Sequence, residues 1–226
     1  KIMKKKPIRD FKKYVEKEIE PALGDLESLD EKNRVHVQKL VYTNLVDRFD
    51  TMVDVTILEN CREEGFTEIS LKDMTGTVTE SELITILMHG ENLQGALDIK
   101  LKNSLRNTVL RKRHSQKLTT LFSVMQPEVN CVGAQRVNVP TGQILEKIKP
   151  QNNVKTPYSI SGYADWLYSR RNSVVHGGGN NKFLENDIKQ LKKLYKKEPA
   201  ATFKIKLSSV SNTVTFYKDV VAILLA

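Results

Sequence analysis

The sequence has little cysteine, few aromatic residues and no long apolar run. Two of its 226 residues are cysteines, Cys61 and Cys131, and they form no Cys-x-x-Cys pair. This excludes a zinc site or a disulfide framework, so we expect two buried thiols in a reducing compartment, the cytoplasm. No apolar stretch approaches the roughly 20 residues that a membrane span needs, so we expect no membrane association.

Cofactor motifs are missing as well. The sequence contains no Walker loop, no Rossmann glycine pattern and no cluster of side chains at metal-ligand spacing. We therefore expect a function that uses neither a cofactor nor a metal. The chain begins at Lys1 rather than at methionine, which is typical of a piece of a longer protein.

The sequence does have a marked excess of positively charged side chains. It contains 36 Lys and Arg residues against 27 Asp and Glu, which gives a net charge of +9. Such a balance favours polyanionic partners, because it attracts them at long range and releases counterions on binding. The charge alone fits nucleic-acid binding and a well-solvated lysine-rich surface equally well.

Helical periodicity dominates the chain. Apolar residues recur at helical spacing, most regularly over residues 33–61, and Thr79 and Glu82 have the spacing of a capping box. Residues 127–160 contain four of the seven prolines, which predicts a long loop or insertion with a short strand around 136–139. The sequence therefore predicts a mainly α fold: one helical bundle over residues 1–226 with an irregular insertion.

The stretch SRRNSVVHGGG, residues 169–179, concentrates polar side chains at the end of a predicted helix. Gly177 is a natural helix stop, because glycine adopts a left-handed backbone without strain, and His176 then lies in the last turn. Histidine titrates near neutral pH, and Arg171 offers a fixed positive fork that suits phosphate. Together these side chains are suited to phosphodiester chemistry.

The angular positions of this pair present a difficulty. At about 100° per residue, Arg171 and His176 lie about 140° apart around an ideal helix, whereas Asn172 and His176 share a face. One straight helix is therefore not expected to bring Arg171 and His176 together. Either the helix breaks at the glycines, or a second copy of the chain supplies the missing partner.

RNSVVHG, residues 171–177, resembles the Arg-x4–6-His signature of the HEPN superfamily (higher eukaryotes and prokaryotes nucleotide-binding). The layout, a helical bundle with the motif late in the chain, is also similar. The resemblance implies a HEPN-like homodimer whose two motifs form one metal-independent endoribonuclease site. It implies that Arg171 binds and polarises the scissile phosphate, that His176 is the general acid or base, and that Asn172 orients the histidine or the phosphate.

The resemblance also implies a biological setting and further residues. Family members commonly act in host defence, as toxins with an antitoxin or regulatory partner, or as antiviral nucleases. Arg170 fits a longer version of the spacing and is a second candidate for RNA contact, with an ion-pair role as its alternative. Asp47 and Asp50 are candidates for the acidic residue that family members often place on an early helix.

A second basic cluster lies at Arg111, Lys112 and Arg113, followed by His114. We expect it to form a basic helix face that either binds the RNA backbone or is simply solvated. His36 and His89 are expected to be structural. Two rival functions stay open: a non-catalytic helical dimerisation or RNA-binding module, and a plain interaction domain in which Arg171 and His176 make caps and ion pairs.

Overall fold

The computed structural model describes residues 3–72, 74, 79–88, 93–134, 136–148, 155–177 and 181–226. Its elements are α1 (Lys6–Tyr14), a π-helical turn η1 (Val15–Ile19), α2 (Glu20–Glu27), α3 (Glu31–Glu59), α4 (Glu64–Lys72), α5 (Glu80–Met88), α6 (Leu93–Thr108), α7 (His114–Met125), α8 (Ile160–His176), α9 (Glu185–Tyr195) and α10 (Leu207–Leu225). Within the described ranges the only β-pairing is two isolated bridges. The predicted mainly helical fold is confirmed.

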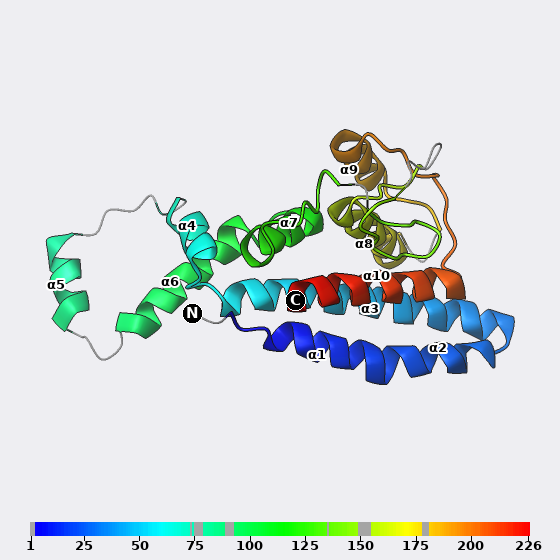
Figure 1. The fold of residues 1–226 in the computed structure, drawn as a ribbon, viewed down its shortest axis with the longest axis horizontal. Helices are drawn as coiled ribbons and strands as arrows, with labels where there is room; N and C mark the ends of the chain where they lie inside the picture. Colours follow the sequence, from blue (N-terminus) through cyan, green and yellow to red (C-terminus); the bar gives the residue numbers. More distant parts are fainter. Residues whose placement is uncertain are drawn as a thin grey trace.

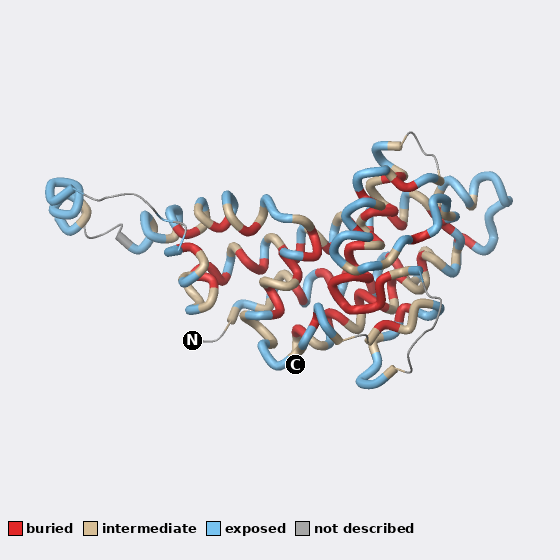
Figure 2. The backbone as a smooth tube through the Cα atoms, turned by 90° about the horizontal axis from the view of Figure 1, so that it is seen from above, coloured by how far each residue is buried: buried red, intermediate tan, exposed pale blue. Residues whose placement is uncertain are grey.

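The long helices α3 and α10 form the centre of the molecule and pack against α1 and α2 (Figure 1). Helices α7 and α8 pack against each other and against α3, and α9 covers α8. One cluster of buried apolar side chains runs through α1, α3, α7, α8 and α10, and the buried stretches of the backbone gather at the centre of the tube (Figure 2). Helix α3 therefore contacts both the α1–α10 layer and the helix that carries the arginine–histidine motif.

Helix α3 buries a somewhat different face from the one that periodicity predicts. Leu40, Leu45, Phe49 and Met52 all belong to the helical apolar pattern of the sequence, but only the last three are buried, and Leu40 is 56% exposed. Tyr42, which the apolar pattern leaves out, is fully buried and donates its hydroxyl to the carbonyl of Leu167 on α8 over 2.8 Å. This hydrogen bond satisfies the buried hydroxyl and joins α3 to α8.

Helices α4, α5 and α6 extend away from this centre, and α5 lies at the far end (Figure 1). The Thr79–Glu82 capping box at the start of α5 is confirmed, since each residue accepts from the other's backbone N–H, over 2.9 and 3.3 Å. None of the α5 residues is buried. His89, expected to be structural, lies outside the described residues.

The predicted insertion packs onto the bundle instead of looping into solvent. Its described residues before Ile160, where α8 begins, form no helix, and the expected strand around 136–139 is reduced to one bridge between Val137 and Ile144. Val137 and Tyr158 are buried, and the N–H of Val137 donates to the carbonyl of Tyr158 over 2.9 Å. Backbone pairing thus satisfies polar groups that burial would otherwise leave without partners.

Both cysteines are buried and free, as expected. Burial raises the pKa of both thiols, which keeps them protonated and weakly nucleophilic near neutral pH. Among the described helices none is both long enough and apolar enough to cross a membrane.

Candidate functional site

Helix α8 carries the motif and is unbroken up to His176. Ser159 caps its start by accepting the N–H of Gly162 over 3.1 Å, and the N–H of Gly177 closes its end on the carbonyl of Ser173 over 2.9 Å. Gly177 has φ −88°, so the expected left-handed backbone is wrong. A Cβ at this position would lie 2.3 Å from the Ser173 oxygen, so glycine is needed here for close approach.

Arg171 and His176 come together within one chain. Nη1 of Arg171 lies 3.5 Å from Nε2 of His176, which is exposed in the last turn of α8. The expectation that one straight helix cannot join them is wrong, because the long arginine side chain spans the angle between their positions. The first reason for invoking a second copy of the chain therefore disappears.

A carboxylate on α3 holds Arg171 in place. Nε of Arg171 lies 2.6 Å from Oδ1 of Asp47, and its Nη2 donates to Oδ2 over 3.0 Å. Nη1 also donates to the amide oxygen of Asn172 over 3.2 Å. Only 18% of the Arg171 side chain is exposed, against 44% for Asp47. The guanidinium thus has a fixed orientation and presents Nη1 on the side of His176.

Asn172 links this pair to a buried ion-pair network. Its Nδ2 donates to Asp187 over 3.4 Å, and Asp187 accepts from Arg113 over 3.2 Å. Nε of Arg113 lies 2.7 Å from both oxygens of Asp165, whose side chain is 0% exposed. Burial raises the pKa of Asp187, although the charge of Arg113 opposes this effect. A continuous polar chain therefore runs from the core to the motif.

The basic cluster 111–113 is not the helix face expected from the sequence. Its residues lie in the turn between α6 and α7, and only Arg111 and Lys112 are exposed. Arg113 forms ion pairs with Asp165 and Asp187, so neither of the two roles left open for it, RNA contact or a solvated helix face, describes its position. Arg111 and Lys112 form no ion pair with any described residue, so their charges are available to a ligand.

Arg170 is also a structural residue, contrary to the RNA contact expected from the sequence. It is only 4% exposed, and its guanidinium carbon lies over the rings of Trp166 at 4.6 Å and Phe203 at 5.1 Å. Its Nη2 donates to the carbonyl of Lys204 over 2.8 Å. Arg170 thereby fastens the segment before α10 to α8 through cation–π contacts and a hydrogen bond.

A second acid–base cluster lies beside the motif. Nδ1 of the buried His114 lies 2.6 Å from Asp50, and Lys117 lies 2.7 Å from Asp50 and 2.6 Å from Asp54. Burial works to raise the pKa of Asp50, but hydrogen bonds and charge from His114 and Lys117 outweigh it and lower that pKa to about 2. The candidate Asp50 thus belongs to a structural ion-pair cluster and has no contact with Arg171.

An aromatic ring separates the two clusters. The ring of Tyr168 stacks on His114 with centroids 4.8 Å apart, and the guanidinium carbon of Arg171 lies 5.8 Å from the Tyr168 centroid. Tyr168 thus supports Arg171 from one side while Asp47 holds it from another.

His36 was expected to be structural. Its side chain is exposed on α3 instead, so it has no packing role in the part of the chain that the structure describes.

Sequence reasoning missed the partners of the motif. The sequence places His114 on a basic face that either binds RNA or is solvated, yet it is 2% exposed, and Asp165, Asp187 and Lys117 were not singled out. The sequence did hold one clue: Asp54 continues the spacing of Asp47 and Asp50, so three acidic side chains lie along one face of α3. Such a stripe beside a packed helix predicts cationic partners.

The described residues contain no group of three or more histidine, cysteine, aspartate or glutamate side chains that could hold a metal ion. Comparison of the chain with models of protein families, with curated proteins and with solved structures finds no match.

Proposed function

We propose that this protein is a metal-independent endoribonuclease in which Arg171 and His176 form the catalytic pair. The observation that carries the proposal is the position of Nη1 of Arg171, 3.5 Å from Nε2 of His176, on a guanidinium that Asp47 holds. A fixed cation beside an exposed imidazole offers both phosphate binding and proton transfer at one place. The likeness of RNSVVHG to the HEPN signature adds support from the sequence.

The mechanism follows from the chemistry of these side chains. Arg171 binds a non-bridging oxygen of the scissile phosphate and stabilises the charge that develops there. His176, exposed at the helix end, takes the proton of the 2′-hydroxyl or gives one to the leaving 5′-oxygen. Asn172 orients Arg171 through its amide oxygen. Attack by the internal 2′-oxygen yields a 2′,3′-cyclic phosphate and a 5′-hydroxyl.

The proposal retains a homodimer, in which two copies of the motif face each other, but no longer needs the second copy to complete a pair. The exposed Arg111 and Lys112 are proposed to contact the RNA backbone. A role in host defence, with an antitoxin or other regulatory partner, extends the same likeness to the HEPN superfamily.

The test is to incubate the protein with single-stranded RNA in excess EDTA and to identify the ends of the fragments. We expect cleavage to persist and to leave 2′,3′-cyclic phosphate and 5′-hydroxyl ends. Loss of cleavage on chelation with recovery in magnesium, or fragments with 5′-phosphate ends, would contradict this mechanism.

One observation favours a second function. Asp47 already pairs with Arg171, and such a pair is also what a structural arginine makes. On this view the chain is a non-catalytic RNA-binding or dimerisation module. It would bind RNA in the same assay and leave the strand intact.

A further inference from the structure

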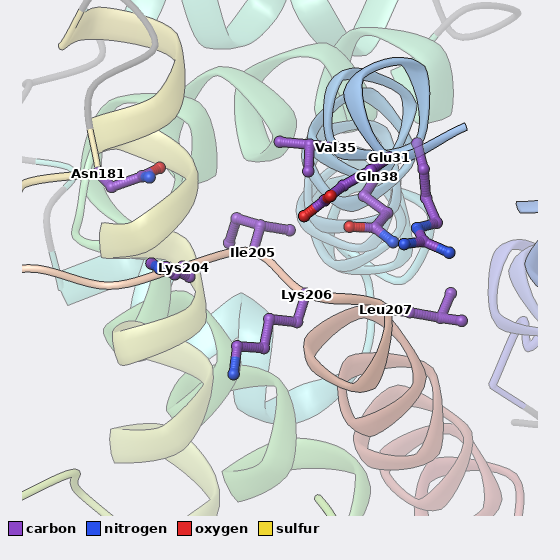
Figure 3. A pocket seen from close by; sticks show the side chains of 9 residues that line it. Glu31, Val35, Gln38, Asn181, Lys204, Ile205, Lys206 and Leu207 are labelled. Carbon is purple, nitrogen blue, oxygen red and sulfur yellow. The ribbon is translucent and has the colours of Figure 1, made fainter. Parts of the chain in front are cut away.

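A pocket lies where the N-terminal ends of α3 and α10 meet the segment that follows α8 (Figure 3). Its volume is about 470 Å³, within the range that small-molecule sites occupy. The hydrogen bond from Arg170 to the carbonyl of Lys204 fixes one wall. The pocket is distinct from the Arg171–His176 pair, since neither residue lines it.

Positive charge gathers at this pocket. Arg34, Lys204 and Lys206 line it, against Glu31 as the one carboxylate among its described lining residues. An adjoining hollow of about 520 Å³ shares Lys204 and Lys206 and adds Lys182. Within the described ranges, none of these four cations takes part in an ion pair. Helix α10 begins at the pocket, and the positive end of its helix dipole adds to this charge.

The interior of the pocket is apolar with unpartnered amides. Val35 and Ile205 supply apolar surface, and Val35 is 42% exposed although it is a large hydrophobic residue. The Gln38 carboxamide faces the pocket, is only 3% exposed and makes no hydrogen bond to a described group (Figure 3). The amide oxygen of Asn181 is buried without a partner. Amides in such places are normally hydrogen-bonded, so both side chains can pair with a ligand that enters the pocket.

We propose that this pocket binds one nucleotide unit, either a free nucleotide or one residue of a single RNA strand. The base lies against the apolar wall of Val35 and Ile205, and its polar edge pairs with the amides of Gln38 and Asn181. The phosphate lies at Lys204 and Lys206, next to the N-terminus of α10. The inference does not depend on ribonuclease activity, because binding at this pocket requires neither Arg171 nor His176.

The experiment measures binding by titration calorimetry and by fluorescence anisotropy. The ligands are nucleoside 5′-monophosphates, the matching nucleosides, inorganic phosphate and a short labelled single-stranded RNA. The His176→Ala protein is used with RNA so that binding is measured apart from cleavage. The Lys204→Gln/Lys206→Gln variant removes two pocket charges, and Gln38→Leu replaces the amide with an apolar group of similar size. Lys13→Gln/Lys17→Gln, on exposed positions of α1 and η1, removes the same charge elsewhere.

We expect Lys204→Gln/Lys206→Gln to weaken binding about tenfold or more, since hydrogen bonds to charged groups are the strong ones. Gln38→Leu should weaken binding without changing its salt dependence, because it removes no charge. Lys13→Gln/Lys17→Gln should bind like the unmodified protein. Binding of monophosphates assigns the pocket to free nucleotides, and binding of RNA alone assigns it to the strand; both support the proposal. Pocket variants that bind as well as the lysine control, or no binding of any probe, would overturn it.

Discussion

Arg171 and Asp47, 124 residues apart in the chain, form an ion pair that joins α8 to α3 beside His176. Because the pair orients the guanidinium toward the imidazole, Asp47 acts as a positioning residue in the proposed site. Its own carboxylate is nearly half exposed, so its contribution to stability is expected to be small.

Asp47→Asn is expected to slow RNA cleavage by up to about 10²-fold, because misplacing a reacting group by a small distance has an effect of this size. Single-turnover rates at saturating protein measure the effect, and thermal unfolding should change little. Asp25→Asn, at an exposed position of α2, is the matched control. Cleavage by Asp47→Asn at the unmodified rate would show that the ion pair has no part in positioning.

Arg113→Ala is expected to destabilise the fold by about 3 kcal/mol or more, because it leaves the fully buried Asp165 carboxylate without its cation. Arg111→Ala, two residues away and exposed, should change the free energy of unfolding by less than about 0.5 kcal/mol. Urea unfolding of both variants checks the contrast. Equal stability of the two variants would show that Arg113 does not compensate the charge of the buried Asp165.

The contrast between Arg111 and Arg113 shows which features of the structure can be predicted from the sequence and which cannot. Helical periodicity, the Thr79–Glu82 capping box and the position of His176 at a helix end depend on near neighbours, so local pattern predicts them. The partners of Arg113 lie 52 and 74 residues away, and only the packing of α7, α8 and α9 brings them together. The Arg171–His176 contact was missed for another reason: helix angle describes Cα positions and ignores the reach of a long side chain.

Asp50→Asn is expected to remove part of the pH dependence of stability. The pKa of Asp50 is lowered from 3.8 to about 2, so its ionised form stabilises the fold above pH of about 4 by roughly 2 kcal/mol. This contribution is lost as the pH falls from about 4 through 2, because the carboxyl is protonated first in the unfolded state and then in the folded state. Urea unfolding should therefore show a difference in the free energy of unfolding between Asp50→Asn and the unmodified protein at pH 6, and this difference should shrink by about half or more at pH 2.5. A difference of constant size would contradict the lowered pKa of Asp50.

Mixing two inactive variants tests whether each chain completes its own catalytic pair. Because Arg171 and His176 meet within one chain, an Arg171→Ala protein mixed with a His176→Ala protein should remain inactive. A differently tagged copy of each confirms that subunits have exchanged. Recovery of cleavage on mixing would show instead that one copy supplies the arginine and the other the histidine.

The most direct test of the central claim is the cleavage rate of His176→Ala beside that of His36→Ala, measured in excess EDTA on the same RNA. Both histidines are exposed, but only His176 lies against Arg171. We expect His176→Ala to lose about 10²–10⁴-fold in rate with unchanged thermal unfolding, the usual effect of removing a general acid or base, and His36→Ala to lose nothing. Equal rates for the two variants would contradict the account.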